Sequence, residues 1–143
     1  MKKRVVSIGT VLFVLLVVGV VLLKLTVPFH YAEASLRPEA LEHVDRLQES
    51  QTLSPTKAAQ AYYYFETDYE GAVPPRIQVS ESVLDKDEVR VSIYDPSVRD
   101  DSTFKSLHRI YLRRAHQGHW VPYKHEWSHQ GRGRLGWTTK PTA

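Results

Sequence analysis

The pattern of apolar and polar positions divides the chain into three parts, and the first part is a long apolar run. Val5–Leu23 contains no charged side chain. As a helix that rises about 1.5 Å per residue, this run spans roughly 28 Å, close to the ~30 Å hydrocarbon core of a bilayer. Lys24 follows the run, and Pro28 limits any further extension of the helix. The run therefore predicts a transmembrane helix.

Apolar residues recur at helical spacing in the second part, which predicts two helices. Pro38–Gln51 has a proline in its first turn and Glu39 near the positive end of the helix dipole. Its apolar stripe is narrow, so the helix is either a juxtamembrane stalk or packed on the domain. In Pro55–Thr67, Ser54 suits the N-cap and Pro55 suits the first helical position. The apolar face predicted for this helix consists of Ala58, Ala59, Ala61, Tyr62 and Phe65.

Apolar and polar residues alternate with a period of two in the third part, which predicts β-strands. The alternation is clearest around Val89, Val91 and Ile93. Pro122 indicates an edge position or a bulge in the last strand. One face of that strand is expected to pack through Val121, Tyr123 and Trp127. We expect four antiparallel neighbours, at Ile77–Leu84, Val89–Tyr94, Lys105–Ala115 and Trp120–Trp127.

Helices followed by strands are typical of an α+β fold. We expect an N-terminal transmembrane helix, then two helices packed on a curved four-stranded antiparallel sheet. The expected parts are a cytoplasmic tip and transmembrane anchor (1–27), a connector with a juxtamembrane helix (28–53), and a small extracytoplasmic domain with an irregular basic tail (54–143). The order of elements looks like the cystatin-like and nuclear-transport-factor-like architectures, which is an analogy of fold alone.

The charges that flank the apolar run predict its orientation. Lys2–Arg4 is entirely cationic, and the positive-inside rule places this end in the cytoplasm. We therefore expect a single-pass protein of the inner membrane, with residues 5–23 in contact with lipid and a periplasmic domain. The alternative is a signal peptide cleaved after Ala34, because Ala32–Ala34 has the small-x-small form of a cleavage site.

Charge is distributed unevenly over the rest of the chain. Residues 33–104 contain fifteen acidic and seven basic residues, a net charge of −8, whereas residues 105–143 contain eight basic residues and one acid, a net charge of +7. One interpretation is a basic surface, including Arg132 and Arg134, that attracts an anionic membrane or another anionic envelope component. The other is that basic strands pair with acidic ones within one sheet. We expect no nucleic-acid partner for a domain outside the cytoplasm.

The sharpest chemical motif is His125-Glu126-Trp127-Ser128-His129, which matches the H-E-x-x-H pattern of zinc metalloproteases. On a helix, His125 and His129 share a face and can bind one zinc ion, with Glu126 as general base. The pattern instead predicts a strand, in which the two histidine backbones lie roughly 13 Å apart. Residues 130–143 also supply no third ligand, because they contain no His, Asp, Glu or Cys. We therefore expect no catalytic, cofactor-binding or metal-binding residues.

Other chemically reactive groups are few. The chain contains no cysteine, so disulfides, thiol chemistry and lipid attachment to cysteine are excluded. His116 and His119 flank a turn, and Asp100-Asp101 precedes Ser102. Both arrangements are more typical of solvated turns than of metal sites.

The segment Val89–Pro141 contains Asp100-Asp101-Ser102, then Gly118-x-Trp120, then Gly131-Arg132-Gly133-Arg134 with Trp137. In these motifs the segment resembles a family of small exported bacterial proteins of uncharacterised function. The resemblance implies export and a compact sheet domain, and it implies no activity. Members often carry a cysteine pair near the tail, whereas this chain has His129, Gln130 and Thr142 in that neighbourhood.

These patterns favour a binding or accessory role over catalysis. The expected partner is a protein of an envelope assembly or an anionic envelope component. The alternative is a minimal zinc hydrolase that uses His125, Glu126 and His129. A third hypothesis is a structural accessory subunit whose main contact is the membrane helix itself.

Overall fold

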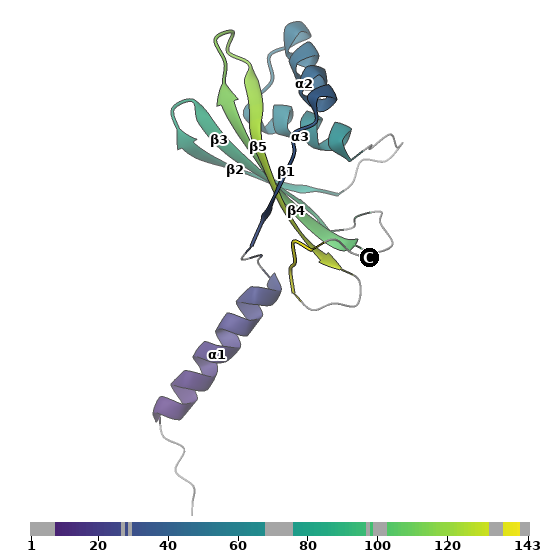
Figure 1. Cartoon of the computed structure of the whole chain (residues 1–143). Helices are drawn as coiled ribbons and strands as arrows, with labels where there is room; N and C mark the ends of the chain where they lie inside the picture. Colours follow the sequence, from purple (N-terminus) through teal and green to yellow (C-terminus); the bar gives the residue numbers. More distant parts are fainter. Residues whose placement is uncertain are drawn as a thin grey trace, which may run out of the picture.

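The computed structural model describes residues 8–26, 28, 30–67, 76–96, 98, 103–131 and 136–140. Over these residues the fold is α+β, with three helices and one five-stranded antiparallel sheet of strand order β1-β5-β4-β3-β2 (Figure 1). The helices are α1 (Ile8–Thr26), α2 (Pro38–Ser50) and α3 (Pro55–Glu66). The strands are β1 (Ala32–Ala34), β2 (Gln78–Asp85), β3 (Glu88–Asp95), β4 (Thr103–Arg114) and β5 (Trp120–Gly131).

The strand count of four expected from the sequence is wrong, because β1 adds a fifth strand to the edge of the sheet. Ala32 pairs with Trp127 and Ala34 pairs with His125, both in antiparallel register. A strand of three residues is too short to show an alternating pattern. The three residues that resemble a cleavage site are therefore a strand of the domain.

The predictions of the two domain helices are confirmed. Pro55 opens α3, and the Ser54 hydroxyl oxygen accepts a hydrogen bond from the Lys57 N–H at 3.3 Å. Pro38 opens α2 in the same position. Of the two placements considered for α2, the structure shows the packed one, since α2 contacts both α3 and β5. The segment expected as a connector thus supplies β1 and α2 to the packed domain.

The hydrophobic core lies between the sheet and α2 and α3. Strand β3 alternates regularly, and its buried residues Val89, Val91 and Ile93 face the helices. Their partners across the ladder in β4 include Leu112 and Ile110, which are also fully buried. The helices add Ala40, Val44, Ala58, Ala59, Tyr62 and Tyr63. The buried side of α3 thus includes Tyr63, which the predicted face omitted.

Helix α1 extends away from the sheet and packs against no other described helix or strand (Figure 1). Its apolar side chains are exposed, for example Leu12 at 61% and Phe13 at 68%. Of the helices that the structure describes, none is both long enough and apolar enough to cross a membrane. The transmembrane helix stays a prediction from the sequence.

Several residues that the sequence singled out lie outside the described residues. They include the cationic N-terminal residues and the acidic loop expected around Asp100. They also include the arginines of the basic tail, Arg132 and Arg134.

Candidate functional site

The H-E-x-x-H motif lies within β5, as the sequence predicts. His125 pairs with Ile110 and His129 pairs with Ser106, and each histidine is 2% exposed on the helix-covered side of the sheet. Glu126 lies between them and faces the opposite side, because successive strand residues alternate. Its carboxylate accepts a hydrogen bond from the Tyr111 hydroxyl at 2.8 Å and lies 2.7 Å from the Lys124 ammonium. The motif therefore does not bring its two histidines and its glutamate together.

The inward face predicted for β5 is wrong in its first half. The register with β4 shifts between Tyr111 and Leu112, which leaves Tyr123 as the extra residue of a β-bulge. Pro122 and His125 consequently both point inward, while Val121 and Tyr123 are 37% and 38% exposed. The bulge inverts the alternation that the sequence pattern assumed.

Beyond the bulge, His125 lies against the half-buried His108 of β4. Nδ1 of His108 and Nε2 of His125 lie 2.9 Å apart, and the two rings stack with centroids 5.1 Å apart. One ring must donate and the other must accept, so the hydrogen bond requires an uncharged acceptor. Two tyrosine rings of α3 cover the pair in edge-on contacts. The Tyr62 and His125 ring centroids lie 5.7 Å apart, and the Tyr63 and His108 centroids lie 5.0 Å apart.

Electrostatics keep this histidine pair neutral. Burial lowers the pKa of His125 to about 4. Burial, followed by repulsion from His125 and His129, lowers the pKa of His108 to about 3. The neighbouring Tyr63 hydroxyl donates to the buried Asp95 carboxylate at 3.1 Å, and burial raises the pKa of Tyr63. At neutral pH the pair is therefore an uncharged polar layer of the core.

This layer does not have the ligand number of a zinc site. Catalytic zinc usually takes three protein ligands. Within the part of the chain that the structure describes, no three His, Cys, Asp or Glu side chains lie close enough to hold a metal ion. The described geometry gives the zinc-hydrolase hypothesis no support.

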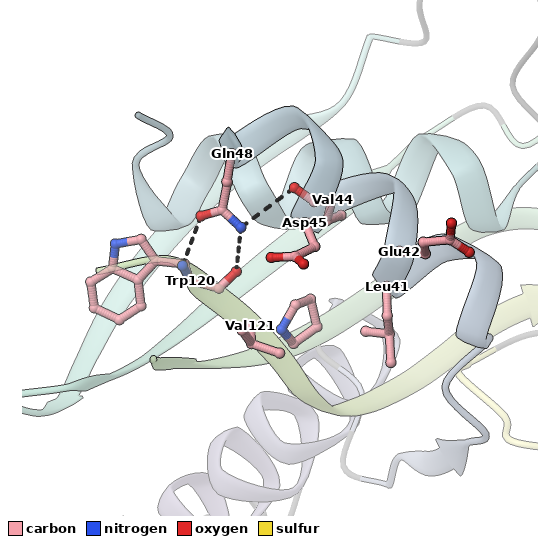
Figure 2. Close-up of a pocket in the computed structure, with 8 residues that line it drawn as sticks. Leu41, Glu42, Val44, Asp45, Gln48, Trp120 and Val121 are labelled. Atoms are coloured by element: carbon pink, nitrogen blue, oxygen red, sulfur yellow. Dashed lines mark hydrogen bonds between the residues drawn. The ribbon is translucent and has the colours of Figure 1, made fainter. Parts of the chain in front are cut away.

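A groove with a different chemistry lies between α2 and the start of β5 (Figure 2). Gln48, which is 6% exposed, closes one end of it. The amide Nε2 of Gln48 donates to the Trp120 carbonyl at 3.1 Å, and Oε1 accepts from the Trp120 N–H at 2.7 Å. The side chain thus takes the place that a neighbouring strand would occupy beside Trp120.

The groove has an apolar lining and an acidic rim. Its cavity volume is about 280 Å³. Asp45 lies near Val121, and Glu42 lies farther along α2, beside Leu41 (Figure 2). The Asp45 carboxylate is 3.1 Å from Nδ1 of His119, whose turn contains Gly118 at φ +81°. The lining residues are Leu41, Glu42, Val44, Asp45, Gln48, Trp120, Val121 and Pro122.

The edge of β5 beside the groove is closed to strand pairing. β1 pairs with β5 only from His125 to Trp127, so the first residues of β5 have no strand on that side among the described residues. There, however, Gln48 occupies the polar groups of Trp120, and Pro122 has no N–H to donate. The bulge at Tyr123 further disrupts the ladder. The groove is consequently open to side chains and not to an added strand.

The opposite face of the sheet carries charges that pair among themselves. Arg113 of β4 donates to Glu88 of β3 at 2.6 and 2.9 Å. The guanidinium carbon of Arg109 lies 3.7 Å from the ring centroid of Tyr31, just before β1. Acid–base pairing between neighbouring strands, one of the two interpretations of the charge asymmetry, therefore occurs at Arg113 and Glu88.

Comparison with known proteins yields no assignment: the chain matches no protein-family model, no curated protein and no solved structure. The groove was not foreseen from the sequence. One signal was present, since Gln48 falls on the same helical face as Val44, where an apolar residue is the usual choice.

Proposed function

We propose that this protein is a single-pass membrane protein whose α+β domain acts outside the cytoplasm as a binding or accessory module in an envelope assembly. Residues 5–23 are its lipid contact, and its N-terminus is cytoplasmic. The support is the uncharged run in the sequence and the outward-facing apolar side chains of α1, such as Leu16 at 66% exposure. Exposed apolar surface of this extent is typical of interaction with lipid or protein.

The position of β1 supports an anchor that is retained. Cleavage after Ala34 removes the whole of β1 and its three pairs with β5. It also removes Tyr31, which stacks against Arg109. A mature chain that begins at Ser35 thus leaves the β5 edge from His125 to Trp127 without its partner strand. Retention of the N-terminal segment keeps this edge covered.

The open groove beside Gln48 is the observation that carries the binding role. It combines apolar surface from α2 and β5 with exposed carboxylates, and it lies at the end of the domain far from α1 (Figure 1, Figure 2). Protein recognition sites typically combine an apolar centre with a polar rim. We propose that a partner protein of the envelope binds here.

The basic tail is a second contact in this proposal. Arg132 and Arg134 add a weak, salt-sensitive attraction to an anionic surface, which fades as the Debye length falls towards ~8 Å at physiological salt. The resemblance to small exported bacterial proteins and the cystatin-like analogy remain hypotheses that agree with export.

Site-specific photo-crosslinking in cells tests the binding role. A photo-reactive residue replaces Val121 in the groove, and the control replaces Val83, which is 72% exposed on β2. We expect a discrete adduct with another envelope protein from position 121 and none of this mass from position 83. The absence of an adduct at position 121, or the same adduct at both positions, contradicts a partner in the groove.

The hypothesis of a structural subunit that acts through its membrane helix has its own test. Exchanging residues 5–23 for an unrelated anchor leaves the groove intact. On our proposal the exchanged protein still forms the adduct at position 121. If the membrane helix is the main contact, the exchange abolishes co-purification of the partner while the domain remains folded.

A further inference from the structure

We infer that the groove between α2 and β5 receives an apolar side chain of the partner protein that is followed or preceded by a lysine or arginine. This inference rests on the proposed binding function and defines the chemistry of the occupant. It follows from the size of the groove, its lining, its charge and the closed edge of β5.

The size of the groove favours a side chain over a complete small molecule. Pockets for drug-sized ligands usually measure about 300–1,000 Å³ and enclose most of the ligand. This groove, at about 280 Å³, lies just below that range and is partly open to solvent. It therefore accommodates one or two side chains that enter from a larger partner.

The lining selects an apolar side chain at the centre. Leu41 and Val44 come from one side of α2, and Val121 and Pro122 come from β5. None of these four side chains has a hydrogen-bonding group. A polar group that is buried among them loses its water without replacement, which disfavours it.

The rim selects a positive charge beside that side chain. Asp45 and Glu42 are both carboxylates, with side-chain exposures of 60% and 70%. Glu42 pairs with Arg46, whose Nε lies 3.8 Å from its carboxylate and whose side chain is itself 64% exposed. An exposed pair of this kind is weak and gives way readily to a competing cation. An acidic or phosphorylated partner segment is repelled by the same two carboxylates.

Two further observations make the occupant a protein segment and define how it binds. The amide of Gln48 and the ring of Pro122 prevent main-chain pairing along β5, so recognition depends on side chains. The groove also lies at the opposite end of the domain from α1 (Figure 1). A lipid surface that contains α1 is therefore remote from it.

Selection from a displayed library of short random peptides tests this inference. The full chain is held in lipid nanodiscs, and the same library is offered to a Glu42→Gln/Asp45→Asn variant that keeps the shape of both side chains. The control is Glu49→Gln, which changes an exposed acid of α2 outside the groove. We expect the selected peptides to contain Leu, Ile or Phe next to Lys or Arg. Their affinity for the double variant is expected to be at least about fivefold lower than for the parent protein, and their affinity for the control variant is expected to be unchanged.

The possible outcomes separate this inference from the proposed function. Selection of acidic peptides, equal binding by the double variant, or selection of nothing overturns the inference. If the partner is still crosslinked at position 121 under any of these results, the binding function stands and only the chemistry of its occupant is wrong. Self-association through the groove, seen as an adduct of twice the chain mass at position 121, overturns both.

Discussion

Gln48 of α2 binds the main chain of Trp120 in β5 through both ends of its side-chain amide. The two hydrogen bonds, at 2.7 and 3.1 Å, join residues that lie 72 positions apart in the sequence. They attach α2 to the open edge of the sheet and define one end of the groove (Figure 2). The fold and the groove thus depend on the same polar contact.

Replacing Gln48 by leucine is expected to destabilise the domain by about 1–3 kcal/mol, because it leaves the N–H and C=O of Trp120 without partners in a part-buried position. Denaturant unfolding followed by tryptophan fluorescence measures the change. The control is Glu49→Leu, which alters an exposed position on the same helix and is expected to stay within about 0.5 kcal/mol. Equal effects of the two substitutions contradict the role assigned to Gln48.

The His108–His125 pair makes the fold sensitive to acid. The pKa values of about 3 and 4 in the folded protein lie below the ordinary histidine value of 6.5. Below pH 6.5 the two histidines become protonated in the unfolded chain but stay neutral in the folded protein. The free energy of unfolding therefore decreases as the pH falls from 6.5 to about 3. The free energy of unfolding is expected to fall by a few kcal/mol, since a pKa shift of one unit corresponds to about 1.4 kcal/mol.

Denaturant unfolding at a series of pH values measures this loss. His125→Phe keeps an aromatic ring at the buried position and is expected to flatten the pH dependence. His116→Gln, at an exposed turn position, is expected to leave it as in the parent protein. A parent protein equally stable at pH 7 and pH 4.5 is incompatible with a neutral buried histidine pair.

Val91 tests the position of the core. It is fully buried on the core face of β3, so Val91→Asp is expected to cost several kcal/mol through burial of a carboxylate without a partner. The same substitution at Val83, which is 72% exposed, is the matched control and is expected to be nearly neutral. An unchanged melting temperature for Val91→Asp means that the inward face of β3 has been misidentified.

Metal content tests the hydrolase hypothesis. Since His125 and His129 belong to a buried strand and Glu126 faces away from them, we expect no stoichiometric zinc in the purified chain. Elemental analysis of the parent and of His129→Ala is then expected to give the same background value. One zinc per chain that disappears in His129→Ala, together with a hydrolytic activity, would falsify this expectation.

The elements with clear local signals were predictable from the sequence. Ser54 and Pro55 define the start of α3 because a cap and a preset backbone angle act within one turn. The strict alternation of β3 identifies both its type and its buried face. These features depend on neighbouring residues, which the sequence shows directly.

The features that were missed depend on contacts between distant segments. β1 is too short for a periodic signal and exists because β5 offers it an edge. The bulge at Tyr123 follows from pairing with β4. It turns Pro122 inward and Val121 outward, whereas an unbroken alternation back from Trp127 places Val121 inward. The partnership of Gln48 with Trp120 likewise requires knowledge of which strand lies beside α2.

The mass of the mature protein, isolated from membranes, tests the central claim most directly. That claim is a domain that keeps its N-terminal anchor, with β1 as the link between α1 and the sheet. We predict a mature chain that retains both residues 5–23 and β1. A mature chain that begins at Ser35 contradicts the account, because it lacks both the anchor and the strand that covers β5.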